Sequence, residues 1–177
     1  EGTVLVRDIV PGIEDSNIQS MRSFDLGSGP RLVFSARARS GPNRLWISDG
    51  TPGGTWRISP PELTSLRAQV DRLGTGLVFI ANQRVWLSAG NPGSARPLPG
   101  VNPAWNCSSV ISDDAGRRCY FAVELQSGGH ELWSTDGTEN GLRIVRSGFK
   151  YAPLQMAYHR GALLFVARGA GQFDLWR

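Results

Sequence analysis

The sequence predicts an all-β fold, and within that class a β-propeller of four blades. Three observations lead to this prediction: the chain is rich in turn residues, a tryptophan motif recurs along it, and a phenylalanine motif recurs with the same period. Its 177 residues include 22 glycines and 11 prolines, which argues against a helical bundle because both residues break helix interiors. Large apolar residues are still frequent enough to build a folded core.

The tryptophan motif is the clearest repeat. It reads Leu-Trp-Ile-Ser-Asp-Gly-Thr at residues 45–51 and Leu-Trp-Ser-Thr-Asp-Gly-Thr at 132–138. A degraded copy, Val-Trp-Leu-Ser-Ala-Gly-Asn, occupies 85–91, and a fourth copy stops after Leu-Trp-Arg at 175–177. The repeated tryptophans, which lie 40, 47 and 43 residues apart, are Trp46, Trp86, Trp133 and Trp176. Such a period is typical of repeat folds.

A short apolar run centred on phenylalanine precedes each tryptophan. These phenylalanines, 45, 42 and 44 residues apart, are Phe34, Phe79, Phe121 and Phe165. Two markers with one period of about 44 residues make chance agreement a poor explanation. A third marker follows the tryptophan, because residues 53–58 and 140–145 resume an extended apolar pattern. Residues 1–7 resemble this third segment without the half that should precede it.

Each repeat is predicted to form four strands. The second strand is the phenylalanine run, the third carries the tryptophan, and the fourth follows the turn. The first strand is more weakly marked, at Gln19–Leu26, Leu66–Leu73, Cys107–Ser112 and Leu154–His159. Asp-Gly between two apolar runs favours a tight hairpin, since glycine accepts a positive φ, and Asp49 and Asp136 can accept hydrogen bonds from the turn backbone. Four strands in about 44 residues are typical of a propeller blade.

The repeats predict one domain over residues 1–177. The first three blades span 10–59, 60–100 and 101–147, and the last combines 148–177 with 1–9. We expect the N-terminal strand to complete the C-terminal blade and to close the ring. The alternative is a fragment of a larger propeller or of a longer array.

The two cysteines fall in the third repeat. Cys107 is expected on its first strand and Cys119 on its second, almost opposite each other across a hairpin, where neighbouring Cα atoms are close enough for a disulfide. A disulfide there would imply an oxidising compartment. The alternative is a reduced, buried pair.

The repeat resembles a bacterial family whose units carry Glu-Leu-Trp-x-x-Asp-Gly-Thr. Residues 131–138 match this signature almost completely, 45–55 match it from the leucine onward, and 1–9 resemble the segment after it. The second and fourth copies depart from it. The resemblance implies a β-propeller in secreted, periplasmic or cell-surface bacterial proteins, often in tandem repeats. It implies no reaction and no catalytic residues, and a propeller hosts many unrelated functions.

Charge and composition argue against several classes of partner. The net charge is +4, and every basic residue except Lys150 is an arginine. The arginines are scattered, which indicates a solvated surface rather than a nucleic-acid interface. No apolar run approaches the roughly 20 residues that cross a bilayer, so membrane insertion is not expected. Each Asp-Gly-Thr turn offers one carboxylate, too few for a calcium site, so we expect neither a metal nor a cofactor.

The candidate ligand-binding residues are Trp56 and Trp105, which lie outside the repeated tryptophan positions and could serve as stacking platforms. The repeated tryptophans are expected in the core. No nucleophile, base and acid are marked as a triad. The sequence therefore predicts a non-enzymatic interaction scaffold that binds a protein partner or ligand at its loop faces or channel, alone or within a larger surface assembly. The alternative function is a carbohydrate-binding module, and a hydrolase at the channel mouth is a weaker hypothesis.

Overall fold

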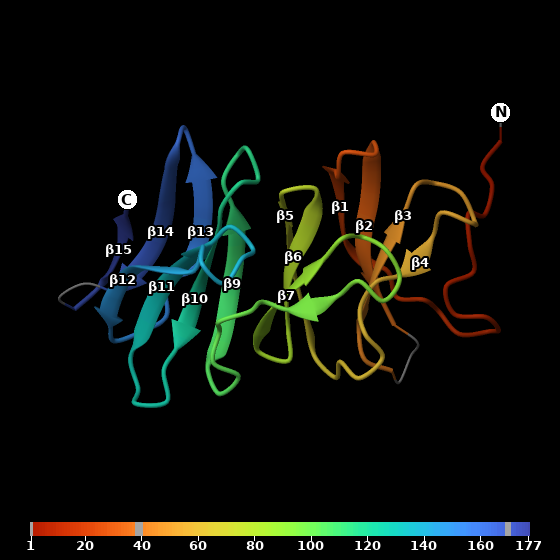
Figure 1. Ribbon diagram of the computed structural model, residues 1–177. Coiled ribbons are helices and arrows are strands. Elements are labelled where there is room, and N and C mark those ends of the chain that lie inside the picture. The colour runs from red at the N-terminus through yellow and green to blue at the C-terminus, as the bar shows by residue number, and fades with distance from the viewer. Residues whose placement is uncertain (1, 38–40, 169–170) are drawn as a thin grey trace.

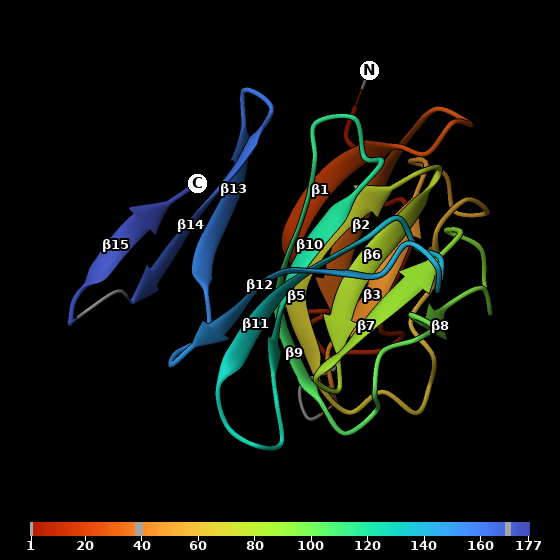
Figure 2. The ribbon, with the colours of Figure 1, turned by 60° about the vertical axis from the view of Figure 1, so that its left-hand side comes forward.

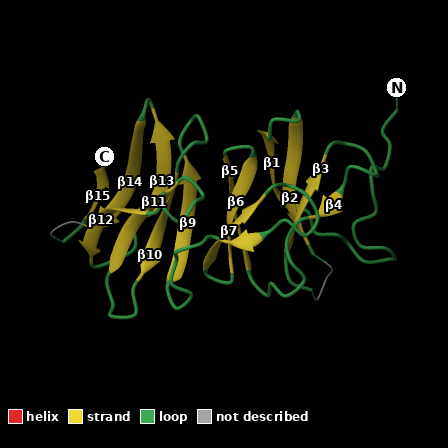
Figure 3. Ribbon diagram, in the orientation of Figure 1, coloured by secondary structure: helices red, strands yellow, loops and turns green. Residues whose placement is uncertain are grey.

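The computed structural model describes residues 2–37, 41–168 and 171–177, and this part of the chain is all-β. It contains fifteen strands in four antiparallel sheets and no helix (Figures 1 and 3). The prediction of an all-β fold made of repeated sheets is therefore confirmed.

In each sheet the strands follow one another in chain order. The first sheet contains β1 (Gln19–Asp25), β2 (Pro30–Ala36), β3 (Arg44–Ser48) and β4 (Trp56–Arg57). The second contains β5 (Leu66–Leu73), β6 (Gly76–Ala81), β7 (Arg84–Ser88) and β8 (Arg96–Pro97). The third contains β9 (Asn106–Ser112), β10 (Cys119–Glu124), β11 (His130–Thr135) and β12 (Arg143–Phe149). The fourth contains β13 (Leu154–His159), β14 (Ala162–Arg168) and β15 (Phe173–Trp176).

The repeated phenylalanine and tryptophan lie directly opposite each other in every sheet. The four pairs are Phe34 with Trp46, Phe79 with Trp86, Phe121 with Trp133 and Phe165 with Trp176. Opposed residues share one face of a sheet. In the second and fourth sheets the two rings stack, with centroids 6.5 Å apart. The indole N–H of Trp86 then donates to the carbonyl of Ala81 at 3.0 Å.

Successive sheets pack face to face, and each pair encloses one apolar core. Phe79 and Trp86 of the second sheet pack against the first, and Phe121 of the third packs against the second. Phe165 of the fourth sheet packs against the third. In the second, third and fourth sheets, the phenylalanine face therefore points to the preceding sheet. In the first three sheets, the opposite face points to the next one.

The first strands of neighbouring sheets also contact one another, β1 with β5, β5 with β9, and β9 with β13. The first strands therefore lie along one side of the array of sheets. The first and last sheets lie at opposite ends of this array, with the N- and C-termini far apart (Figure 1). Figure 2 shows β13–β15 at the outer end of the array.

The predicted ring closure is not present in this structure. Residues 2–18 form no strand, and β13–β15 is a three-stranded sheet without an N-terminal strand. The N-terminal segment lies instead on the first sheet, where the Arg7 guanidinium donates to the carbonyl of Thr55 at 2.6 Å. The N-terminal residues resemble the fourth strand of a repeat and were therefore predicted to pair with the last sheet. The edge strand of that sheet, β15, lies at the other end of the array.

The predicted disulfide is wrong, because both cysteines are free and buried. The hairpin pairs Cys119 with Ser112, so Cys107 lies opposite Val123 rather than opposite Cys119. Four residues of extended strand separate the two positions by about 13 Å, well beyond the Cα spacing of a disulfide. Burial raises the pKa of the Cys107 thiol to about 11 and raises the pKa of Cys119 as well.

Candidate functional site

The Asp-Gly-Thr turns use their carboxylates to hold the turn itself. The Asp49 carboxylate accepts hydrogen bonds from the N–H of Thr51 at 2.9 Å and from its hydroxyl at 2.7 Å. These bonds lower the pKa of Asp49 below its usual value. The Asp136 carboxylate accepts the same two bonds from Thr138, at 2.9 and 2.7 Å, and its pKa is lowered for the same reason. The two aspartates therefore have the structural role that the repeat predicted.

Each of these turns also depends on a glycine five residues after the aspartate. A Cβ on Gly54 would overlap the Asp49 carboxylate, and one on Gly141 would overlap that of Asp136. The degraded second copy lacks both members of the pair, with Ala89 and Ser94 at these positions. The Ser94 hydroxyl instead lies 2.9 Å from that of Ser88. Aspartate and glycine are thus lost together, because the carboxylate fills the space that a side chain would need.

The two candidate stacking tryptophans contact neighbouring parts of the protein. The indole N–H of Trp56 donates to the Gly90 carbonyl at 2.8 Å, across the interface between the first and second sheets. The Trp105 ring lies 5.3 Å from that of Trp133, at the edge of the core between the second and third sheets. These contacts give both indoles a packing role, and the structure does not bring the two together in one site.

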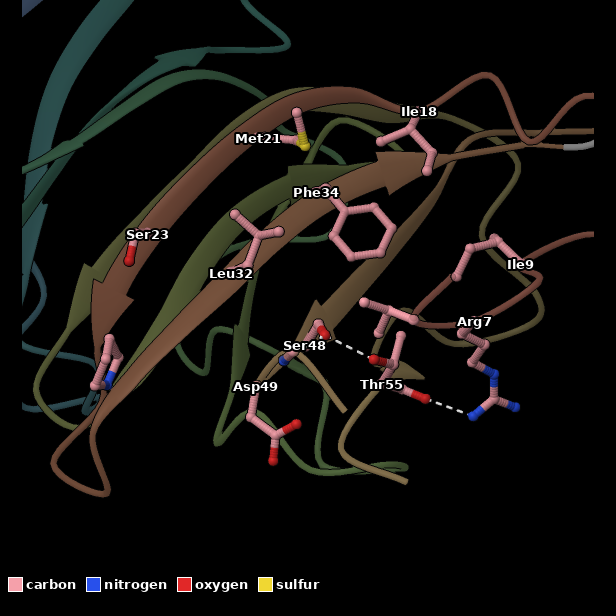
Figure 4. Close-up of a pocket in the computed structure, with 13 residues that line it drawn as sticks. Arg7, Ile9, Ile18, Met21, Ser23, Leu32, Phe34, Ser48, Asp49 and Thr55 are labelled. Atoms are coloured by element: carbon pink, nitrogen blue, oxygen red, sulfur yellow. Dashed lines mark hydrogen bonds between the residues drawn. The ribbon is translucent and has the colours of Figure 1, made fainter. Parts of the chain in front are cut away.

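A cavity lies on the outer face of the first sheet. It is an open hollow of about 410 Å³, shown in Figure 4. Its apolar lining includes Val6, Ile9, Ile18, Met21, Leu32 and Phe34, and its polar rim includes Arg7, Ser23, Ser48, Asp49 and Thr55. The Arg31 guanidinium lies 3.7 Å from the Asp49 carboxylate beside this rim. The hollow is therefore an apolar floor with a hydrogen-bonded polar margin.

The floor of this hollow is the phenylalanine face of the first sheet, for which no preceding sheet is present in the described chain. Met21 is 64% exposed, whereas Val70 at the equivalent place in the second sheet is 3% exposed. Leu32 is 39% exposed, whereas its equivalent Leu77 is 1% exposed. Phe34 remains buried and lines the hollow together with Ile9 of the N-terminal segment (Figure 4). The hollow therefore occupies the place where a further sheet would pack.

The opposite end of the array carries a matching exposed residue. Leu175 on β15 is 72% exposed, whereas its equivalents Leu45, Val85 and Leu132 are each 2% exposed or less. These three equivalents lie in the cores that the first, second and third sheets each share with the next sheet. The described array of sheets therefore has an exposed apolar residue on each of its two outer faces, which are of opposite kinds.

Sequence reasoning missed this site because it treated the repeats as equal. The signal was available in the repeat itself, since Met21, Leu32 and Leu175 fall at positions that are apolar in the other repeats and are buried or half-buried there between two sheets. Among the residues that the structure describes, no group of three or more His, Cys, Asp or Glu side chains could hold a metal ion. Nor does that part of the chain contain a helix long and apolar enough to span a membrane.

The chain matches no protein-family model and no curated protein sequence.

Proposed function

We propose that this chain is a non-enzymatic interaction scaffold, built from four propeller blades, that binds a protein partner through the outer face of its first sheet. A secreted, periplasmic or cell-surface location follows from the repeat resemblance. The observation that carries the proposal is the exposure of Met21 and Leu32 at positions that are buried in the second and third sheets. Contiguous exposed apolar surface with a polar rim is typical of protein interfaces.

The distinctive residues of the repeat already have structural tasks. The repeated phenylalanines and tryptophans of the second, third and fourth sheets pack in the cores between sheets, and Asp49 and Asp136 hold turns. The stacked sheets form a rigid frame. Binding to a rigid surface loses little conformational entropy, because few loops and side chains have to be ordered. The outer face of the first sheet is then the surface that this frame presents.

The test is site-specific photocrosslinking in the cells that produce the protein. A benzoylphenylalanine at Met21 is expected to give protein adducts, which mass spectrometry then identifies. The same group at the exposed loop residue Ser127 is the control and should give none of these adducts. Equal labelling at Met21 and Ser127, or no protein adduct at Met21, would contradict the proposal.

The carbohydrate alternative predicts a different result. A glycan array would show specific binding, and Trp105→Ala would abolish it while the protein remained folded. Since Trp105 packs against Trp133, folding of this variant should be checked by circular dichroism. Glycan binding together with no protein adduct at Met21 would replace the scaffold proposal with a lectin-like function.

A further inference from the structure

We propose that the partner at the outer face of the first sheet is a second copy of this chain, which docks with the outer face of β13–β15. This inference rests on the proposed function, because it names the protein that the same surface binds. It makes the two open ends of the array the two halves of one interface.

The first argument is that the internal interfaces already show how these two faces fit. In each of them, the phenylalanine face of one sheet packs against the opposite face of the sheet before it. The first sheet offers an uncovered phenylalanine face, with Met21 and Leu32 exposed. The fourth sheet offers an uncovered face of the opposite kind, with Leu175 exposed. The two ends therefore have the complementarity that the protein uses between its own sheets.

The second argument comes from the N-terminal segment. Aligning Gly2-Thr3 with Gly54-Thr55 places Val6 at the position of Ile58, which is buried in the core shared with the next sheet. Val6 likewise lies against the first sheet, where it lines the hollow. The segment thus occupies the place of the fourth strand of a preceding blade, although it has no strand partner in this structure.

The third argument is that the last sheet lacks this strand. β3, β7 and β11 each pair with a fourth strand, whereas β15, their equivalent, forms the edge of a three-stranded sheet. An unpaired edge exposes N–H and C=O groups that can pair with another chain. If β13–β15 of a second copy fills the hollow, its β15 edge lies beside residues 4–7 of the first copy and the blade becomes complete.

The two faces of a single chain lie at opposite ends of the array (Figures 1 and 2). They therefore meet between copies, and the contact is head to tail. Such an interface closes into a ring when the rotation permits and otherwise produces open chains. Two copies joined at both ends would form a ring of eight blades.

The experiment is sedimentation velocity over a wide range of protein concentration. We expect a mass of twice 19.2 kDa at high concentration, dissociating to a single chain on dilution. Leu175→Asp and Met21→Asp should each weaken self-association about 30-fold or more, as central interface residues do. Ile13→Asp is the matched control, since Ile13 is fully exposed and does not line the hollow, and it should leave self-association unchanged.

A mixing experiment distinguishes this interface from a symmetric one. The Leu175→Asp chain keeps an intact first sheet, and the Met21→Asp chain keeps an intact last sheet, so a mixture of the two should regain a two-chain species. Because both residues are exposed in the single chain, neither variant should change the thermal midpoint measured at high dilution.

Three results would overturn the inference: a single-chain mass at every concentration, a dimer that neither substitution weakens, or a mixture that does not recover the two-chain species. A single-chain mass together with adducts between Met21 and a different protein would overturn this inference alone. The proposed scaffold function would then stand.

Discussion

The second and third sheets differ from the first and fourth in how many of their faces are covered. An inner sheet has a neighbour on each side, so its phenylalanine face and its opposite face are both in a core. An end sheet has one neighbour and leaves equivalent residues exposed. Leu132 and Leu175 occupy the same position of the repeat, yet one is buried and the other is not. Burial in this protein is thus decided by the neighbouring sheet rather than by the repeat sequence.

The largest expected difference between inner and end positions is in thiol labelling. A Leu175→Cys thiol should react quickly in the dilute native protein, whereas Cys107 and Cys119 should react only through unfolding, on the order of a thousandfold or more slower. Intact mass is expected to show one adduct in the native variant and three in denaturant. Fast native labelling of three thiols would remove the distinction between the inner core and the open end.

The wild-type chain provides the control for the cysteine pairing. In denaturant without reductant it should take up two adducts, because Cys107 and Cys119 are free. Uptake that requires prior reduction would show a disulfide and contradict the register of β9 and β10.

Truncating equivalent leucines of an inner sheet and an end sheet should change the free energy of unfolding by different amounts. Leu132→Ala is expected to lower the free energy of unfolding by about 2–5 kcal/mol, since it leaves a cavity in a closed core. Leu175→Ala should change it by no more than about 0.5 kcal/mol at high dilution, because that side chain is already in solvent. Urea unfolding monitored by tryptophan fluorescence provides both values. Equal losses would mean that the end face is covered within one chain.

The turn contacts should not distinguish an end sheet from an inner one, since they lie within a single hairpin. Gly54→Ser in the first sheet and Gly141→Ser in the third should each lower the free energy of unfolding by roughly 1–3 kcal/mol, because the new side chain overlaps a carboxylate. Adding Asp49→Ala to Gly54→Ser should restore most of the loss, as the Ala89 and Ser94 pair of the second copy suggests.

Gly53→Ser is the control for this pair of variants, since nothing lies within 4 Å of a Cβ at that position. Urea midpoints of the single and double variants test the coupling. A Gly54→Ser variant as stable as Gly53→Ser would show that the carboxylate does not need the space.

The smallest expected effect is in the pH dependence of stability. The folded-state pKa values of Asp49 and Asp136 lie below the usual 3.8, so their contribution is fully present above that value. It is lost as the pH falls through the lowered folded-state pKa. Replacing both with Asn should reduce the loss of stability between about pH 5 and pH 2, measured by urea unfolding. If the double Asn variant lost as much unfolding free energy over this pH range as the wild type, the threonine hydrogen bonds would not favour the ionised carboxylates.

Much of the fold could be predicted from the sequence, because the strands of each repeat are encoded locally. The phenylalanine runs, the tryptophan strands and the Asp-Gly turns lie where the motifs placed them. The disulfide prediction failed because of the hairpin register, in which Cys119 pairs with Ser112 next to the turn and Cys107 pairs with Val123 further along the strand. The partner of the N-terminal segment could not be predicted, because the repeat specifies how a strand packs but not which sheet supplies its neighbour.

For the candidate site as well, local features could be predicted from the sequence, whereas features that depend on neighbouring sheets could not. The repeat identified Asp49 and Asp136 as turn residues, and the structure shows the hydrogen bonds that make them so. Trp56 and Trp105 were selected because they stand outside the repeat, but both lie in contacts between elements. The repeat marks Met21 and Leu32 as apolar positions, but the hollow exists because no further sheet covers them in the described part of the chain, and a local pattern does not say which sheet lies next to which.

Amide hydrogen exchange at low and high protein concentration tests most directly whether the two open ends form one interface. The account predicts that residues 4–7 and β15 exchange rapidly in dilute solution and become protected together as concentration rises, while β6 and β10 stay protected throughout. Protection of residues 4–7 and β15 that does not change with concentration would contradict it, whether both segments were always open or already paired within one chain.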